Sequence, residues 1–195
     1  MEQPLVSILI RTCGRPHILR MALNSILEQT YKNIEVIIVE DGNNASEEML
    51  KRDYGQLSYI YEATGQKVGR CEVGNRAMKL ATGMYMNFLD DDDAFFPEHI
   101  ERLVNEIEHS SERAVYSIAE ERQIIPNEKE YTQSVVKNKM IRYKQPFNRL
   151  LLYTMNYIPI QSILFERTLF EELGGLDKTL DTLEDWDLWV RYSTV

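Results

Sequence analysis

Acidic side chains gather in two short runs of the sequence, and carboxylates are the groups in this chain best suited to chemistry. Four consecutive aspartates occupy residues 90–93, and a second run begins with Glu184 and Asp185 and ends at Asp187. Adjacent carboxylates repel one another, and partial burial would raise their pKa values. A divalent cation relieves that repulsion and prefers hard oxygen ligands. The first run therefore predicts a Mg²⁺ or Mn²⁺ site, with a solvated acidic turn that caps the next helix as the alternative.

The second run fits either a helix cap or a sugar-binding surface. Acidic residues are favourable in a first helical turn, so capping alone accounts for Glu184 and Asp185. Trp186 and Trp189 are spaced like core residues, yet a tryptophan beside a carboxylate also suits a sugar ring. The residue types leave both interpretations open.

One further carboxylate and three cations fall in segments that are expected to be loops. Asp41 follows the apolar residues 34–39 and precedes a glycine, where it fits either a plain turn or a hydrogen bond to a base or ribose. Arg15, Lys67 and Arg70 are suited to a diphosphate, although each alone is also an ordinary surface charge.

Apolar stretches that alternate with amphipathic ones must position these groups. Short β-branched runs predict buried strands, and apolar spacings of three and four residues predict helices. Expected strands cover residues 6–10, 34–39, 57–61, 84–89, 114–119 and 161–165, and expected helices begin near residues 16, 46, 73, 97, 147, 168 and 184. This alternation predicts a mainly parallel α/β sheet with helices on both faces.

Ligands of such sheets bind beyond the carboxyl ends of the strands. The polar clusters at residues 11–15, 40–44 and 90–93 each follow an expected strand, so we expect all three at one edge. Residues 120–146 are polar and poorly periodic, and we expect them to form a long loop over that edge.

The composition is that of a soluble globular protein and excludes some classes of function. The chain has 195 residues, 44% of them hydrophobic, and a formal net charge of −9. Such acidity argues against nucleic acid as a partner. Two cysteines without metal-type spacing, no leader and no membrane-spanning run favour the cytoplasm. The last helix lacks a stop signal, so we expect the chain to continue past Val195, and any contact with the inner face of the membrane to lie in that continuation.

Five motifs in the same order resemble the family 2 glycosyltransferases, which have the GT-A fold. They are VSILIRTCGR at 6–15, EVIIVEDG at 35–42, the segment 69–83 with Asn75, FLDDDD at 88–93, and FEELGG at 170–175 followed by Glu184 and Asp185. The resemblance covers nearly the whole chain and implies a Rossmann-like catalytic domain over residues 1–195. It also implies a nucleotide-binding half at residues 1–110 and an acceptor-binding half at residues 111–195.

The same resemblance implies a role for each motif residue. Most of these residues would bind the nucleotide; they are Thr12, Arg15, Asp41, Arg70, Asp90 and Asp91. In the D-x-D element, Asp92 would bind Mn²⁺ or Mg²⁺. Asp185 would be the catalytic base, and Glu184 and Trp186 would bind the acceptor.

The implied activity is inverting transfer of a sugar from a nucleotide-diphosphate sugar, with a UDP-sugar as the expected donor. The acceptor would be a saccharide or a lipid-linked hydroxyl in surface polysaccharide or glycolipid synthesis. Arg11, Cys13 and Gly14 stand where the family has proline, tyrosine and asparagine, which removes aromatic stacking on the base. The Q-x-x-R-W element of processive members is absent, so we expect one sugar per encounter. The alternatives are a sugar-nucleotide pyrophosphorylase, which would need a glycine-rich loop near the N-terminus that this sequence lacks, a non-catalytic nucleotide-sugar-binding module and a docking domain.

Overall fold

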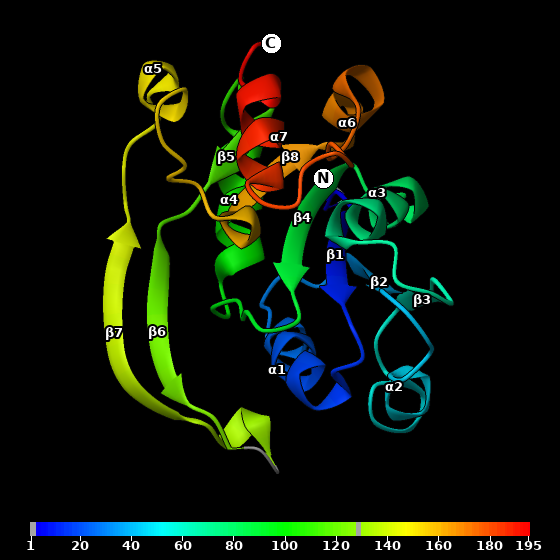
Figure 1. Ribbon diagram of the computed structural model, residues 1–195. Coiled ribbons are helices and arrows are strands. Elements are labelled where there is room, and N and C mark those ends of the chain that lie inside the picture. The colour runs from blue at the N-terminus through cyan, green and yellow to red at the C-terminus, as the bar shows by residue number, and fades with distance from the viewer. Residues whose placement is uncertain (1–2, 128–129) are drawn as a thin grey trace.

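A six-stranded sheet forms the centre of the molecule (Figure 1). The structure is a computed structural model that describes residues 3–127 and 130–195. In spatial order the strands of the sheet are β3 (Tyr59–Ala63), β2 (Ile34–Glu40), β1 (Val6–Thr12), β4 (Tyr85–Asp90), β8 (Ile163–Glu166) and β5 (Ala114–Tyr116). The first four run parallel, whereas β8 is antiparallel to both of its neighbours. The predicted mainly parallel α/β fold is confirmed.

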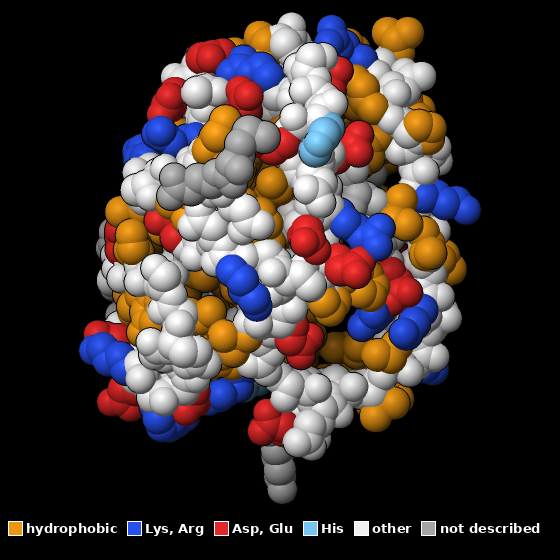
Figure 2. Space-filling view, turned by 180° about the vertical axis from the view of Figure 1, so that it is seen from behind, with side chains coloured by type: hydrophobic (Ala, Val, Ile, Leu, Met, Phe, Trp, Pro, Cys, Tyr) orange, Lys and Arg blue, Asp and Glu red, His pale blue; other side chains and the backbone are white. Residues whose placement is uncertain are grey.

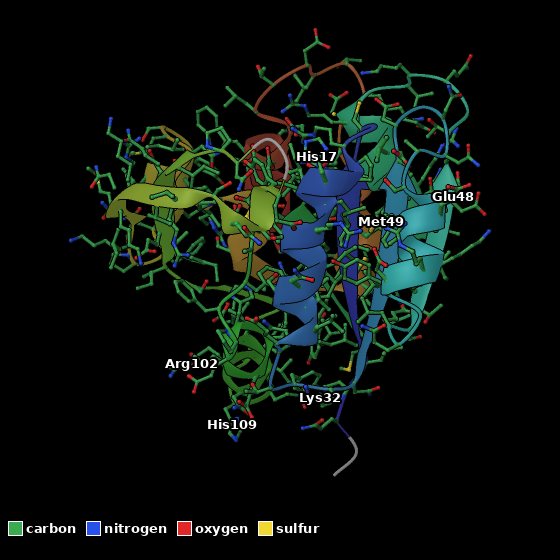
Figure 3. The ribbon with its side chains drawn as sticks, turned by 90° about the horizontal axis from the view of Figure 1, so that it is seen from below. His17, Lys32, Glu48, Met49, Arg102 and His109 are labelled. Carbon is green, nitrogen blue, oxygen red and sulfur yellow. The ribbon has the colours of Figure 1, made fainter. Side chains whose placement is uncertain are left out.

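Helices cover both faces of this sheet. One face carries α1 (Pro16–Leu27), α2 (Glu47–Asp53) and α4 (His99–Glu108), and the other carries α3 (Arg70–Leu80), α6 (Arg167–Leu173) and α7 (Glu184–Tyr192). Figure 3 shows the orientation of α2, in which the buried Met49 lies on the sheet side and the exposed Glu48 on the outer side. Within the described residues, no helix is long and apolar enough to cross a membrane.

Strand β1 shows why these residues form a central strand. Ile8 and Ile10 belong to the core on the α1 side, and Leu9 belongs to the core on the α3 side. Successive side chains of a strand point to opposite faces, so a run that is apolar at every position suits a strand buried on both. The burial of all seven β1 residues agrees with that reading.

The segment expected to be a long loop is instead a two-stranded ribbon. Antiparallel β6 (Ala119–Ile125) and β7 (Val135–Tyr143) flank the short η1 turn (Tyr131–Gln133) and stand beside the main sheet (Figure 1). Every β7 residue except Tyr143 is exposed. With neither face of β7 buried, no alternation of apolar and polar residues marks the strand in the sequence.

Smaller differences concern element boundaries. The third strand lies two residues later than expected, and the expected strand at 114–119 is divided between β5 and β6. The expected strand at 161–165 begins with a 3₁₀ turn, η2 (Ile160–Ser162), before β8. The helix expected near residue 147 is the single turn α5 (Arg149–Leu152), capped by the Asn148 side chain.

Candidate active site

The three polar clusters meet at one edge of the sheet, as predicted. Parallel strands β1, β2 and β4 all end there, and their loops are joined by backbone hydrogen bonds. The amide of Asp41 donates to the Thr12 carbonyl at 2.8 Å, and the amide of Asp91 donates to the Arg11 carbonyl at 3.3 Å. Figure 3 labels His17, which lies at the start of α1 just after the loop that follows β1.

Arg11 connects the two acidic runs at the centre of this edge. Its Nε donates to Asp90 Oδ1 and its Nη2 to Asp90 Oδ2, both at 2.7 Å, and its Nη1 donates to Glu184 Oε1 at 3.0 Å. The Arg11 side chain is only 8% exposed. Because both carboxylates surround the guanidinium, the pKa of Arg11 lies above its ordinary value despite the burial that opposes it.

Glu184 was expected to bind the acceptor, and the structure places its side chain beneath the surface of the site. Its side chain is 4% exposed, and its carboxylate is taken up by Arg11, with Arg70 Nη1 a further 3.7 Å away. A side chain with so little exposed surface offers little access to a substrate hydroxyl. Glu184 therefore belongs to the framework of the site.

Thr12 and Asp91, which were expected to contact the nucleotide, are both buried in this structure and contact each other. The Thr12 hydroxyl donates to Asp91 Oδ2 at 2.7 Å, and Arg15 Nε donates to the same oxygen at 3.1 Å. The Arg15 guanidinium also contacts Asp91 Oδ1. Burial raises the pKa of Asp91, while these hydrogen bonds favour its charged form. The pair fixes the loops after β1 and β4, and the exposed part of Arg15 remains free to face a ligand.

Asp41 holds the backbone of the segment that leads into α3. Its carboxylate accepts hydrogen bonds from the amides of Val68, at 2.7 Å, and Gly69, at 3.2 Å. Gly69 has φ of 90°, a conformation that favours glycine, and it precedes the first residue of α3, Arg70. The Arg70 side chain is well exposed and lies at the edge, where a diphosphate would need a cation.

Glu40, the last residue of β2, contacts the nearby loops and was not singled out from the sequence. Its buried carboxylate accepts hydrogen bonds from the Gly14 amide at 2.9 Å, from the Ser46 amide at 3.0 Å, and from the Tyr61 hydroxyl at 2.5 Å. Beside it, Lys67 Nζ lies 3.0 Å from Cys13 Sγ. Glu40 therefore fixes the backbone of the loop that follows β1, and Lys67 lies beside that loop at Cys13.

Asp92 has the chemistry expected of a single-carboxylate metal ligand. Its side chain is 50% exposed, and the nearest cation, Arg15 Nη2, is 3.6 Å away. No group of three or more His, Cys, Asp or Glu side chains in the described part of the chain is arranged to hold a metal. Mg²⁺ typically takes one or two carboxylates and completes its coordination with phosphate and water, so one open carboxylate fits such an ion.

Asp93, the last residue of the first run, lies between this edge and the ribbon. Burial, together with the charges of Asp90 and Asp92, raises the pKa of Asp93 to about 7. A cavity of about 420 Å³ opens here, lined among others by Asp92, Asp93, His99 of α4, Glu120 of β6 and Tyr143 of β7. The ribbon thus forms one wall of a hollow with mixed polar and apolar lining, next to the predicted metal ligand.

Asp185 stands in the first turn of α7 with its carboxylate held at both oxygens. Oδ2 accepts from Asn156 Nδ2 at 3.1 Å, and Oδ1 accepts from the amide of Trp186 at 2.8 Å. Burial raises the pKa of Asp185 above its ordinary value. No pattern in the sequence marks Asn156, because it lies in an irregular segment between α5 and η2.

The two tryptophans of α7 differ in position. Trp189 is buried in the core, and its Nε1 donates to the Ile158 carbonyl at 3.2 Å. Trp186 is half-buried, and its Nε1 donates to the Leu152 carbonyl at 2.6 Å. Only Trp186, beside Asp185, keeps part of its ring available to a ligand.

Carboxylates and cations at the carboxyl edge of a doubly wound sheet are the arrangement of a nucleotide-binding α/β protein. The family model described as glycosyl transferase family 2 matches residues 7–174. The chain belongs to this family, and the predicted family membership is confirmed.

Relatives by sequence carry the same family name. An uncharacterized glycosyltransferase of Rickettsia prowazekii is 30% identical over 98% of this chain, and the chain spans 59% of the length of that protein. The putative colanic acid biosynthesis glycosyl transferase WcaA of Escherichia coli is 28% identical over 97% of this chain and is covered over 66% of its own length.

Solved structures show the same GT-A fold. The complex of Staphylococcus aureus TarS 1-349 with UDP has a TM-score of 0.72 and 17% identity, over 94% of this chain and 53% of that one. The complex of the mannosyltransferase PcManGT from Pyrobaculum calidifontis with GDP-Man and Mn²⁺ has a TM-score of 0.71 and 17% identity, over 98% of this chain and 52% of that one.

Proposed function

We propose that the chain is the catalytic domain of an inverting, non-processive glycosyltransferase that moves a sugar from a nucleotide-diphosphate sugar to an acceptor hydroxyl. One observation carries the proposal. Asp185 presents a half-buried, hydrogen-bonded carboxylate, and its neighbour Glu184 is joined through Arg11 to Asp90 of the D-x-D element. A base and a donor-binding carboxylate therefore belong to one connected site.

The donor lies along the carboxyl edge in this proposal. Asp41 and Asp90 accept hydrogen bonds from the nucleoside, and the exposed Arg15, Lys67 and Arg70 face the diphosphate. A UDP-sugar is the first candidate, because TarS, which has the same fold, is known in complexes with UDP and UDP-GlcNAc. GDP-Man, the ligand of PcManGT, is the second.

Asp92 would hold the divalent cation, with phosphate and water completing the coordination. When bound, such an ion stabilises the charge that grows on the departing diphosphate. The positive side chains of Arg15 and Arg70 add to that stabilisation from the loops on either side.

Asp185 would act as the general base. An acceptor hydroxyl is a weak acid, so its proton must pass to a positioned carboxylate as attack proceeds. The acceptor oxygen forms a bond to the anomeric carbon while the bond from that carbon to the diphosphate breaks. The diphosphate leaves with the electron pair, and Asp185 keeps the proton. A single displacement of this kind inverts the anomeric centre.

The acceptor would enter from the side of Trp186 and the cavity beneath the ribbon. The half-buried indole of Trp186 suits a sugar ring, and the cavity of about 420 Å³ ends at Asp92 and Asp93. A saccharide or lipid-linked hydroxyl is the acceptor class in this proposal. Surface polysaccharide or glycolipid synthesis is the proposed role, in keeping with the relative named for colanic acid biosynthesis.

The test is hydrolysis of a donor by water in the absence of an acceptor, measured by release of UDP from UDP-GlcNAc and of GDP from GDP-Man with Mn²⁺ present. We expect Asp185→Asn to lower turnover by about 10²- to 10⁴-fold, the usual contribution of a general base, with the dissociation constant of the nucleotide unchanged. Asp181→Asn, at an exposed residue of the preceding loop, is the matched control and should behave like the parent protein. Equal turnover in Asp185→Asn and Asp181→Asn would contradict the assignment.

A further inference from the structure

Arg11 is the residue at which both acidic runs converge, and it stands where related sequences are expected to have proline. Three of its five N–H groups are engaged, two with Asp90 at 2.7 Å and one with Glu184 at 3.0 Å. Asp90 ends β4, whereas Glu184 begins α7, so one side chain spans elements that are far apart in the sequence. In the described residues Asp90 has no other ion-pair partner, and Glu184 has one more, Arg70 Nη1 at 3.7 Å.

We propose that Arg11 is a positioning residue which, by binding Glu184, fixes the first turn of α7 and thereby places the carboxylate of Asp185 relative to the donor site. This inference rests on the proposed function, in which Asp185 is the base. Arg11 itself touches neither the acceptor nor the reacting bond; it acts through Glu184.

The start of α7 shows why such an anchor is needed. Leu183, which precedes the helix, has φ of 62°, and among the described residues it is the one non-glycine residue with positive φ. That conformation is disfavoured for a residue with a branched side chain and persists only where the surroundings impose it. Leu183 also supplies no side-chain cap to the helix. The Glu184–Arg11 pair holds the residue directly after Leu183, and it acts beside the contacts of Asp185 with Asn156 and of Trp186 with Leu152.

The surroundings of Arg11 fix the direction of its guanidinium. The Arg11 guanidinium carbon lies 5.6 Å from the centre of the Phe88 ring, and α3 passes close by at Gly74. A Cβ at Gly74 would lie 2.6 Å from Leu176 Cδ1 and 3.4 Å from Arg11 Cδ, so α3 approaches the arginine stem to van der Waals distance. A lysine has a single ammonium group and no planar fork, so it cannot bind Asp90 at both oxygens and reach Glu184 together.

A purely structural ion pair would make a different prediction. Loss of such a pair lowers the free energy of unfolding but leaves the turnover of each folded molecule unchanged. Loss of a positioning contact lowers turnover of the folded protein at unchanged donor affinity, because a displacement of about 1 Å at a reacting group can cost about 100-fold. The split between turnover and affinity therefore separates the two roles.

Glu184→Gln is the variant to use first, because it leaves Arg11 bound to both oxygens of Asp90. We expect the UDP dissociation constant from calorimetry to stay within about threefold and the turnover of UDP-GlcNAc hydrolysis to fall about 10- to 100-fold. Arg11→Lys should lower turnover as well, and Arg11→Lys/Glu184→Gln should lower it no further than the more damaging single variant. Arg113→Lys is the control, since Arg113 also bridges two carboxylates, Glu166 and Glu172, but at the opposite edge of the sheet.

A second measurement needs no activity. Hydrogen exchange of the peptide covering residues 184–192 should quicken in Glu184→Gln and Arg11→Lys and stay unchanged in Arg113→Lys. Unchanged turnover in Glu184→Gln, additive losses in the double variant, or unchanged exchange would each overturn the inference. If the parent protein binds no nucleotide, the proposed function fails by itself, and the exchange experiment still decides whether Arg11 anchors α7.

Discussion

Carboxylates of the same chemical type take different roles in this site because their surroundings differ. Asp91 is buried and paired with Thr12 and Arg15, so its carboxylate holds the loops after β1 and β4 together. Asp92, one residue later, keeps half of its surface exposed and remains open to a ligand. Asp185 is half-buried and accepts only neutral hydrogen bonds, which leaves it basic enough to take a proton.

The pH dependence of turnover follows from the surroundings of Asp185. Burial raises its pKa, and the hydrogen bond from Asn156 opposes that rise. Since the base must be ionised, turnover increases with pH through the pKa of Asp185, at a higher pH than for an ordinary aspartate. Asn156→Ala removes the opposing hydrogen bond and should move this acid limb to still higher pH. Donor hydrolysis measured from about pH 4 to about pH 9 checks it, and an acid limb at the same pH in both proteins would count against Asp185 as the base.

Elements far apart in the chain are tied together by single polar side chains. Asn75 of α3 accepts from the Leu176 amide through Oδ1 and donates to the Leu176 carbonyl through Nδ2, both at 2.8 Å. A Cβ at Gly175 would lie 2.1 Å from Asn75 Oδ1, so the glycine is required for this close approach. The turn between α6 and α7 is thereby fixed to the helix that begins at Arg70.

Asn75→Ala should therefore destabilise the fold. It leaves a buried amide and a buried carbonyl without partners, which costs about 1–3 kcal/mol. Urea unfolding followed by circular dichroism measures the change in the free energy of unfolding. Asn105→Ala, on the exposed face of α4, should change it by less than about 0.5 kcal/mol. A loss no larger than that of Asn105→Ala would show that the tie between α3 and Leu176 contributes little.

The sequence predicted the elements whose environment is one-sided or fully buried. Apolar runs such as 6–10 and 34–39 correspond to central strands, and the polar residues that follow them meet at the edge as expected. The ribbon was not predicted, because β7 has no buried face that would give an alternating apolar pattern. The Arg11–Glu184 pair and the Asn156 contact escaped it because each joins residues whose closeness depends on the packing of α7, which periodicity does not encode.

The molecule as a whole is acidic, and most of the polar side chains at its central sheet are paired with one another. Figure 2 shows Asp, Glu, Lys and Arg side chains interspersed over the back of the molecule, with hydrophobic side chains exposed among them. His99 lies inside, where its Nε2 is 3.1 Å from Asn87 Oδ1 and its ring stacks on Phe95 at 4.3 Å. This histidine, to which the sequence assigned no role, joins α4 to β4.

His99 makes the stability of the whole molecule depend on pH. Burial lowers its pKa from the ordinary value of 6.5 to about 4. As the pH falls from about 6.5 to about 4, the unfolded chain takes up a proton that the folded chain resists, so stability is lost over that window. His99→Gln has no such proton to bind. Urea unfolding of both proteins at several pH values should show the advantage of the parent protein shrinking toward low pH; a constant difference would contradict this.

The most direct test of the central claim, that the carboxyl edge binds a nucleotide-diphosphate sugar through Asp92 and a divalent cation, is calorimetric titration with UDP and with GDP. The titrations are run with and without Mn²⁺, on the parent protein, Asp92→Ala and the exposed-site control Asp181→Ala. The account predicts that one nucleotide binds in the presence of Mn²⁺, that Asp92→Ala abolishes this metal-dependent binding, and that Asp181→Ala leaves it intact. Binding of neither nucleotide to the parent protein, or equal binding to Asp92→Ala, would contradict it.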